Sequence, residues 1–248
     1  MIALRRLARY ALHPTLFLQR VFFMCGRFRR GWQMGEGSEI HHWDHWLASH
    51  GKNQDDERSF RDRCDPCLPL QAHVAALLPS VETVSVLDIG AGPLTVLGKV
   101  CLGHKVEITA VDVLGDAYQE LLARHGVSAL VPTQKCASEE LTALFAHSSF
   151  DLVYARNTLD HSLDPIEAIR QALLVVKSGG YLLLEHEVNE GMREDYTGFH
   201  QWNLYEAGSQ LFVSNRAKSV CVNEEFKGVA NVECETVGTW LTARIRKH

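Results

Sequence analysis

"VSVLDIGAGPLT", residues Val84–Thr95, is the stretch of sequence that decides the fold. Its run of β-branched and apolar residues predicts a buried strand, which ends in an acid, Asp88, and breaks at once into Gly90 and Gly92. Glycines let a ligand approach the backbone closely, and a carboxylate accepts hydrogen bonds from a cationic or amino-bearing group. A plain strand and turn is the simpler interpretation. We expect instead a strand, a ligand-binding loop and the N-terminal end of a helix.

Strand and helix patterns alternate along the chain around this stretch. The sequence predicts helices over Leu70–Leu78, Asp116–His125, Glu139–Ala146 and Pro165–Lys177. It predicts strands over Val84–Ile89, Val106–Val111, Ser128–Pro132, Phe150–Ala155, Tyr181–Glu185, Val229–Val237 and Thr239–Arg246. Strands that are apolar throughout and alternate with helices are typical of a parallel sheet covered on both faces. We therefore expect an α/β fold, with a mostly parallel, doubly wound sheet of seven strands and an antiparallel C-terminal hairpin.

The composition is that of a soluble globular protein, because 46% of the 248 residues are hydrophobic and 22% are charged. No apolar stretch reaches the roughly 20 residues that span a bilayer. The net charge of −5 does not suggest a nucleic-acid partner, and seven scattered cysteines are typical of a reducing compartment. We therefore expect a cytoplasmic protein that binds no nucleic acid.

Residues 1–68 precede the regular pattern, and we interpret them as a helical N-terminal extension and candidate lid in front of a binding domain over residues 69–248. Residues 1–35 hold seven arginines and no acid. Such a basic, partly apolar segment can cover its own domain, lie on an anionic membrane surface or act as a targeting segment.

Two short motifs in the extension resemble metal sites. In "HHWDHW", His41–Trp46, histidines could share a helix face, but packing of the two tryptophans onto the core is the better interpretation. Cys64–Cys67 matches C-x-x-C without the second cysteine pair that a zinc site needs, so we interpret it as a loop.

Polar residues follow the other predicted strands at the point where each ends. Asp112 closes "VEITAVD" and is placed to hold two ribose hydroxyls or to cap the helix after it. "CASEEL", Cys136–Leu141, follows the third strand, and "RNTLDHSLDP", Arg156–Pro165, follows the fourth. Because the carboxyl ends of parallel strands meet at one edge of a sheet, we expect Asp88 and Asp112 to face a shared hollow there.

The order of these motifs resembles a class I S-adenosylmethionine-dependent methyltransferase over about residues 80–246, from VLDIGAGP through ITAVD, CASEEL and FDLVYARNTLDHSLDP to KSGGYLLLEH. The cofactor-binding residues that this resemblance implies are Asp88, Gly90, Ala91, Gly92, Asp112, Val113, Ser138, Glu139 and Asn157. It places the first acid and the glycines at the methionine part of S-adenosylmethionine, and Asp112 at the ribose. It places Ser138 and Glu139 beside the adenine, and Asn157 beneath the methionine carboxylate or sulfonium. Leu94 stands where the family usually has its third glycine.

Three histidines follow strands of the predicted ligand edge, namely His161, His186 and His200. Methyl transfer to oxygen needs a base near neutral pH, which histidine suits. We expect His161 to be the base, with His200 second and His186 third, and each has an alternative structural role. The polar segment Asn189–Leu204 carries side chains that suit sugar hydroxyls.

The sequence therefore predicts methylation of oxygen in a small or glycan-like acceptor. No compact spacing demands a metal, so we predict none; the alternative, by resemblance to some sugar-modifying members of the family, is a divalent cation held by Asp160, Asp164 and Glu187. Two rival functions remain open. One is methylation of a lipid or quinone with residues 1–35 resting on a membrane, and the other is a catalytically silent binding subunit with this fold. A nicotinamide-dependent reductase is disfavoured by Asp88 and by Thr95 at the third position of the dinucleotide glycine motif.

Overall fold

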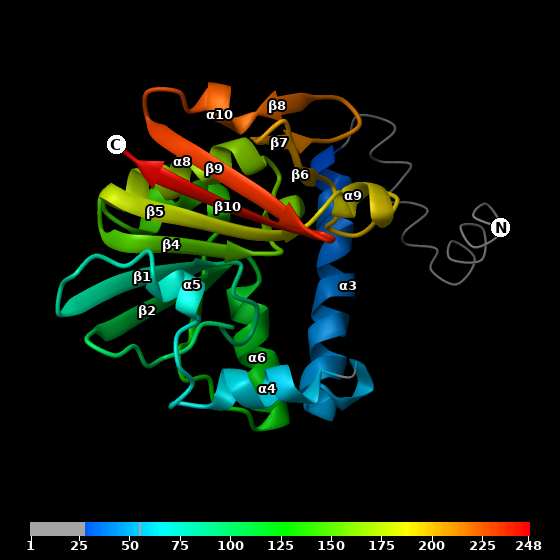
Figure 1. The fold of residues 1–248 in the computed structure, drawn as a ribbon. Coiled ribbons are helices and arrows are strands. Elements are labelled where there is room, and N and C mark those ends of the chain that lie inside the picture. Colours follow the sequence, from blue (N-terminus) through cyan, green and yellow to red (C-terminus); the bar gives the residue numbers. More distant parts are fainter. Residues whose placement is uncertain (1–27, 55) are drawn as a thin grey trace.

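A seven-stranded sheet forms the centre of the molecule (Figure 1). The computed structural model describes residues 28–248 apart from residue 55. The strands are β1 (Thr83–Ile89), β2 (Lys105–Asp112), β3 (Thr133–Lys135), β4 (Phe150–Arg156), β5 (Val176–Glu187), β9 (Ala230–Val237) and β10 (Trp240–Lys247), in the spatial order β3-β2-β1-β4-β5-β10-β9.

The directions of the strands confirm the predicted sheet. The pairs β1–β2, β2–β3, β1–β4 and β4–β5 are parallel, and β10 is antiparallel to both β5 and β9. The C-terminal hairpin therefore inserts its second strand beside β5 and leaves its first strand at the edge. The carboxyl ends of β1, β2, β4 and β5 lie at one edge of the sheet, as the strand order requires.

Both faces of the sheet are buried, which explains its nearly continuous apolar strands. In β4, Val153 and Ala155 pack on one face, against α7 (Leu141–Leu144) and α8 (Pro165–Val175). Leu152 and Tyr154 pack on the other face, against α5 (Ala72–Ala75) and the loop after β1. The α/β class and the doubly wound arrangement follow from this alternation.

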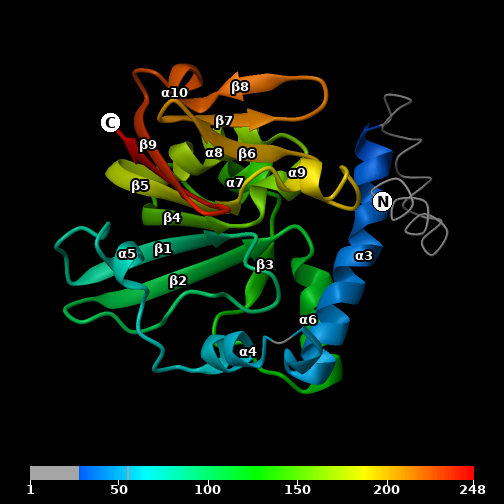
Figure 2. The same ribbon diagram turned by 45° about the vertical axis from the view of Figure 1, so that its right-hand side comes forward.

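A small antiparallel sheet extends the first of these faces. It consists of β6 (Asn203–Ala207), β7 (Gln210–Ser214) and β8 (Ser219–Cys221), followed by α10 (Val222–Glu225). It lies beside β9 and α8 (Figure 2) and adds Leu204, Leu211 and Val213 to the main core. The sequence interpretation assigned no strands to this region.

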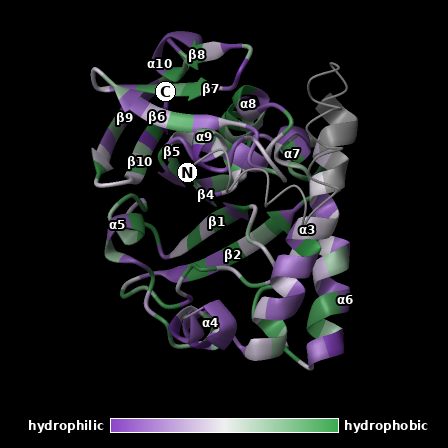
Figure 3. Ribbon diagram, turned by 90° about the vertical axis from the view of Figure 1, so that its right-hand side faces the viewer, coloured by the Kyte–Doolittle hydropathy of each residue, from purple (hydrophilic) through white to green (hydrophobic). Residues whose placement is uncertain are grey.

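The described part of the N-terminal extension contains one long helix, α3 (Phe28–Ser49), and a short one, α4 (Glu57–Cys64). Figure 1 shows α3 running along the edge at which the parallel strands end. Its hydropathy is mixed along its length (Figure 3), and its buried residues Trp46 and Leu47 pack with α6 (Gly115–His125). Asp44 adds polar contacts to the same helix, to Arg124 at 3.1 Å and to His125 at 2.7 Å. The tryptophans of "HHWDHW" thus serve packing, as expected.

Several predicted boundaries are wrong. The third strand is Thr133–Lys135, not Ser128–Pro132, because only residues 133–135 pair with β2. The helix expected over Leu70–Leu78 is a single turn, and the one over Pro165–Lys177 ends at Val175, where β5 begins. The helix expected over Glu139–Ala146 is a 3-10 turn, Ser138–Glu140, followed by α7.

The largest correction concerns the loop after β1, where the expected helix is absent from residues 90–104 of the described structure. The backbone groups that a helix would pair internally have other partners. The side chain of Gln71 donates to the carbonyl of Val96 and accepts from the amide of Gly98. A Cβ on Gly98 would lie 2.0 Å from the carbonyl oxygen of Pro69, so the two segments approach more closely than a side chain would allow. No helix dipole therefore acts at this loop.

No helix in the described part of the chain combines the length and the apolar character that crossing a bilayer requires. The expectations for residues 1–27, including membrane contact, fall outside the described residues. The described part of the C-x-x-C motif has no disulfide, since Cys64 and Cys67 are both free.

We expect Leu47→Ala to lower the free energy of unfolding by about 2–5 kcal/mol, because Leu47 is fully buried between α3 and the domain. Urea denaturation would measure the change. Leu102→Ala is the matched control, since Leu102 is fully exposed and should change stability by less than about 0.5 kcal/mol. Equal losses in both variants would contradict the docking of α3.

Candidate functional site

Asp88 lies at the carboxyl end of β1 and is almost completely buried. The hydroxyl of Thr95 donates to its Oδ2. Burial raises the pKa of Asp88 to about 7, and the Thr95 hydrogen bond and the nearby Arg63 only partly oppose this. Asp88, the carboxylate that we expect to bind the cofactor, is therefore held in a low-dielectric position next to the glycine loop.

Asp112 lies at the equivalent position of β2. Its Oδ2 accepts from the amide of Gly92 at 3.2 Å, and its Oδ1 accepts from the amide of Leu114 at 2.9 Å. Burial raises the pKa of Asp112 to about 6. Asp112 is not the N-cap of α6, because that position belongs to Leu114. The carboxylate instead ties the glycine loop to the end of β2.

The two glycines of the loop have left-handed backbones, with φ of 65° at Gly90 and 64° at Gly92. Other side chains already occupy the space beside them. A Cβ on Gly90 would lie 1.8 Å from the hydroxyl oxygen of Thr158, and a Cβ on Gly92 would lie 3.0 Å from the ring of Trp43. The open hollow that we expected between the two acids is thus narrowed by Thr158 and Trp43 in this conformation.

Helices α3 and α4 supply the residues that cover the loop. The indole of Trp43 donates to Glu39 Oε1 at 2.9 Å. The guanidinium of Arg63 lies 5.4 Å from the centre of the Trp43 ring and donates to the carbonyl of Leu94 at 2.8 Å. The extension therefore contacts the glycine loop directly, through an aromatic ring and through a hydrogen bond.

The residues expected beside the adenine contact one another and the segment before α8. Ser138 donates to Glu139 Oε2 at 2.9 Å, and Glu139 Oε1 accepts from the amides of Leu163 and Asp164 at 2.7 and 3.0 Å. Val113 is partly buried in the cluster between α3 and α6. Ala91 follows Gly90 in the loop and is buried. Glu139 thus has a structural partner on each oxygen.

Asn157 follows β4 with a left-handed backbone, at φ 48°. Its amide nitrogen donates to the carbonyl of Glu185, and its side-chain Oδ1 accepts from the amide of Glu187 at 3.0 Å. These contacts fix the ends of β4 and β5 relative to each other. They place Thr158, the next residue, against Gly90.

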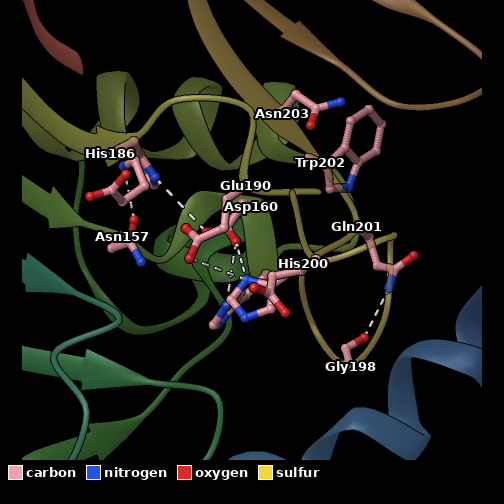
Figure 4. A network of polar contacts seen from close by, with 12 residues as sticks. Asn157, Asp160, His186, Glu190, Gly198, His200, Gln201, Trp202 and Asn203 are labelled. Atoms are coloured by element: carbon pink, nitrogen blue, oxygen red, sulfur yellow. Dashed lines mark hydrogen bonds and ion pairs between the residues drawn. The ribbon is translucent and has the colours of Figure 1, made fainter. Parts of the chain in front are cut away.

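The three predicted histidines meet around one buried carboxylate, Asp160 (Figure 4). Its Oδ2 lies 2.7 Å from His200 Nδ1 and 3.4 Å from His161 Nε2, and its Oδ1 lies 3.9 Å from His186 Nδ1. Residues 159–161 form a 3-10 turn after β4, His186 lies near the end of β5, and His200 follows α9 (Glu190–Arg193). Three separate segments therefore supply this group, which we call the Asp160 cluster: Asp160, His161, His186, Glu190 and His200.

The charges of the Asp160 cluster depend on one another. Burial alone would raise the pKa of Asp160, but His161 and His200 hold it below its usual range. Burial alone would lower the pKa of His200, but its hydrogen bond to Asp160 raises it. Burial lowers the pKa of His186 to about 4 and raises that of Glu190 to about 7. Such strongly shifted groups at a ligand edge are typical of functional sites.

The cluster borders a small cavity of about 100 Å³ between α3 and the segment after α9. The cavity is lined by Gly35, Ser38, Glu39, Glu194, Thr197, Gly198, Phe199 and His200. Of the three histidines, His200 is the one that lines it. A second cavity, of about 300 Å³, lies beside α6 and is lined by neither acid of the glycine loop.

The side chains of the polar segment Asn189–Leu204, which we expected to suit a sugar, mostly form hydrogen bonds within the segment. Gln201 is buried and donates to the carbonyls of Tyr196 and Gly198, and Asn203 donates to the hydroxyl of Tyr196. The indole of Trp202 donates to the carbonyl of Ser162. In Figure 4 Gln201 turns toward Gly198 and away from Asp160. These side chains fold the segment and give no support to a sugar-binding role.

The alternative cation set of Asp160, Asp164 and Glu187 is not assembled. Asp164 caps α8 by accepting from the amide of Ile166 at 3.1 Å, and Glu187 pairs with Arg193. Asp160 has His161 and His200 as its neighbours instead.

Sequence reasoning missed the roles of Glu39, Trp43, Arg63 and Thr158. The first three lie in the extension, and no pattern in one sequence says which side chains of a helix will dock on a distant loop. The signal for Thr158 was the glycine at position 90, since a glycine is needed wherever another side chain approaches within contact distance.

Comparison with known proteins agrees with this arrangement. A family model described as a methyltransferase domain matches residues 39–220, which is more than half of the chain. No curated protein matches.

Similar solved structures include the cyclase SpnF, at 25% identity over 47% of this chain and 43% of that chain, with a TM-score of 0.38. The complex of the Haloferax volcanii methyltransferase activator Trm112 with a methyltransferase matches at 17% identity over 83% and 97% of the two chains, with a TM-score of 0.44. An S-adenosylmethionine-dependent methyltransferase from Mesorhizobium loti matches at 13% identity over 71% and 96%, also with a TM-score of 0.44.

We expect Asp88→Asn to stabilise the fold in a pH-dependent way. The pKa of Asp88 rises from its ordinary value of 3.8 to about 7 on folding, so the wild type loses stability as pH rises through that window. The gain of the variant over the wild type should therefore grow from pH 4 to pH 7 and level off above it. Urea denaturation at each pH measures this, and a gain that does not change with pH would contradict the burial of an ionising carboxylate.

Proposed function

This chain belongs to the methyltransferase-domain family, whose methyl donor is S-adenosylmethionine, and we propose that it methylates an oxygen of a small or glycan-like acceptor. The observation that carries the proposal is that one sheet edge holds two different groups of residues. The glycine loop with Asp88 and Asp112 lies at β1 and β2, and the Asp160 cluster lies at β4 and β5.

The residues at β1 and β2 fit the cofactor in kind. S-adenosylmethionine supplies an electrophilic methyl group on a sulfonium, together with a cationic amine and two ribose hydroxyls. Asp88 is a buried carboxylate close to the two glycines of the loop, and it suits the cationic part of the cofactor. Asp112 suits the ribose, because its carboxylate can accept hydrogen bonds from both hydroxyls.

The Asp160 cluster lies on the acceptor side and would activate the oxygen. In the transfer, the new O–CH3 bond forms as the C–S bond breaks, and the electron pair of that bond stays on sulfur. The proton of the acceptor hydroxyl would leave to a basic group of the cluster. Because His200 borders the cavity while Asp160 holds its Nδ1, it is the histidine best placed to bind the acceptor.

The size of the cavity supports a small reacting group. About 100 Å³ admits a few heavy atoms, so the rest of the acceptor must lie outside or displace the covering residues. Glu39 of α3 and Thr197 line it, which gives a polar entrance. Gln201 and Asn203 do not support a sugar-like acceptor, so this part of the proposal depends on the polar entrance alone.

The extension would act as the lid of the cofactor site. Trp43 lies against Gly92, where a cofactor must approach the backbone, so α3 has to shift before the cofactor binds. The contacts that hold α3 in this position include the packing of the Trp43 ring, the interface with α6 and the ion pair of Asp44 with Arg124. These contacts are compatible with a reversible movement of one helix.

A second candidate function is a silent member of the family that binds a partner and transfers no methyl group. The observation in its favour is that Thr158 and Trp43 stand beside both glycines. Calorimetry with S-adenosylmethionine separates the two candidates, since the silent member would show no binding. The lipid or quinone alternative depends on residues 1–35, most of which lie outside the described residues.

We expect Asp112→Ala to weaken binding of S-adenosylmethionine by about 1–3 kcal/mol, which is about 5- to 150-fold in dissociation constant, because ribose hydroxyls lose their acceptor. Isothermal titration calorimetry measures the constant. The control is Asp116→Ala, which removes an exposed acid four residues away that pairs only with Lys135 in the described structure. An unchanged constant in Asp112→Ala would refute the ribose role.

We expect His200→Gln to lower kcat by at least about 100-fold while the dissociation constant of S-adenosylmethionine stays within twofold. The reason is that His200 belongs to the acceptor side only. A labelled methyl donor with fractionated cell extract identifies an acceptor first, and initial rates with that acceptor then measure kcat. His147→Gln is the matched control, because His147 is an exposed histidine. Full activity in His200→Gln would move the role to another residue.

A further inference from the structure

We propose that Asp160, His161 and His200 bind one divalent transition-metal ion and that this ion holds the acceptor oxygen. The binding of the ion stands on the structure of the Asp160 cluster alone. Its role toward the acceptor rests on the proposed function.

Three ligand atoms converge at this point, namely Asp160 Oδ2, His161 Nε2 and His200 Nδ1. They lie 2.7 Å (Oδ2 to His200), 3.0 Å (His161 to His200) and 3.4 Å (Oδ2 to His161) apart. Ligands that bind one ion at about 2.1 Å are about 3.0 Å apart at a right angle and about 3.4 Å apart at the tetrahedral angle. The three separations therefore match a shared ion after small shifts.

Hydrogen bonds satisfy all three atoms only if both imidazole N–H groups are directed at one carboxylate oxygen, Asp160 Oδ2. If His200 Nδ1 carries a proton and donates it to Asp160, His161 Nε2 has two possibilities. It either accepts part of that hydrogen bond through its lone pair, or it carries a proton of its own beside the N–H group of His200. In the first case the lone pair of His161 faces the carboxylate at 3.4 Å, and in the second two N–H groups meet at 3.0 Å. A cation between the atoms turns all three lone pairs into ligands.

Buried polar atoms without hydrogen-bond partners surround this point. They are Asp160 Oδ1, both ring nitrogens of His186 and Glu190 Oε2. Asp160 and His186 are each 1% exposed, so water from the surface does not reach them in this conformation. Buried groups of this kind are normally satisfied, and a metal ion with its bound waters is one of the things that satisfies them.

His186 and Glu190 border the three ligand atoms but do not belong to the group that could share one ion. His186 Nδ1 lies 3.9 Å from Asp160 Oδ1, and Glu190 Oε1 lies 3.8 Å from His200 Nδ1. Both separations are too long for a hydrogen bond, so these two residues leave the coordination positions of the ion open. Figure 4 shows His186, Glu190 and His200 all directed toward Asp160.

The donor set selects the kind of ion. Imidazole nitrogens suit zinc, iron, copper and nickel, whereas magnesium and calcium prefer sites made of oxygens alone. Two histidines and one carboxylate also leave coordination positions open. An acceptor hydroxyl bound at an open position loses its proton to water more readily, because the ion lowers its pKa.

Histidines elsewhere in the chain provide a matched control. His41 and His45 lie on α3 with ring centres 4.2 Å apart, and both are exposed. A surface pair of this kind can also bind zinc weakly, so removing it separates adventitious binding from the Asp160 cluster.

The test uses the full chain, freed of metal with a chelator and titrated with ZnCl2 in a calorimeter. We expect one tight Zn²⁺ site per chain, weakened at least tenfold by Asp160→Asn and by His161→Gln, and unchanged by the double variant His41→Ala/His45→Ala. Millimolar MgCl2 should not displace the zinc. Circular dichroism verifies the fold of each variant, and if Asp160→Asn is unfolded, His161→Gln decides.

The proposal is overturned if zinc binds wild type and folded cluster variants equally, or if the His41/His45 variant alone loses the binding. Titration of S-adenosylmethionine into the same metal-free chain keeps the proposed function separate. Cofactor binding without tight zinc binding would remove the ion and leave the methyltransferase. Zinc binding without cofactor binding would leave the ion and remove the methyltransferase.

Discussion

The parallel pairing of β1, β2, β4 and β5 is the constraint on which the rest of the structure depends. It forces four strands to end at one edge, so residues separated by up to about a hundred positions in the chain become neighbours. Asp88 and Asp112 come from the first pair of strands, and Asp160 and His186 follow the second. The sheet thus brings the proposed donor site and the proposed acceptor site side by side.

Burial sets the properties of the charged groups at that edge. Asp88, Asp160 and His186 are almost completely inaccessible, and each has a shifted pKa for that reason or because of a close partner. Such groups destabilise a fold, since a buried charge without full compensation is unfavourable. Their concentration at the ligand edge is the pattern expected where stability is given up for binding or chemistry.

The sheet could be predicted from sequence, because runs such as "VSVLDIG" and "FDLVYA" combine strand propensity with burial on both faces. The convergence of His161, His186 and His200 followed from their positions after strands. The loop after β1 could not be predicted. Its backbone is held by Gln71 and by the close approach of Pro69, and no sequence pattern connects these two residues with the loop. Nor could the centre of the histidine group be predicted, since the sequence alone does not show that Asp160 lies in the 3-10 turn while Asp164 caps α8. The packing of Trp43 and Trp46 was expected, but the contacts by which α3 docks on the glycine loop were hidden, because its hydropathy has no clear single face.

Helix α3 reaches both halves of the edge. Trp43 lies at the glycine loop, while Trp32, three turns earlier, stacks on Phe199 at 4.7 Å and donates its indole proton to the carbonyl of His161. A rigid helix cannot leave one of these places without disturbing the other. Under the proposed function, a movement of α3 that frees the glycine loop would also disturb the contacts beside His161, so the two halves of the edge would open together.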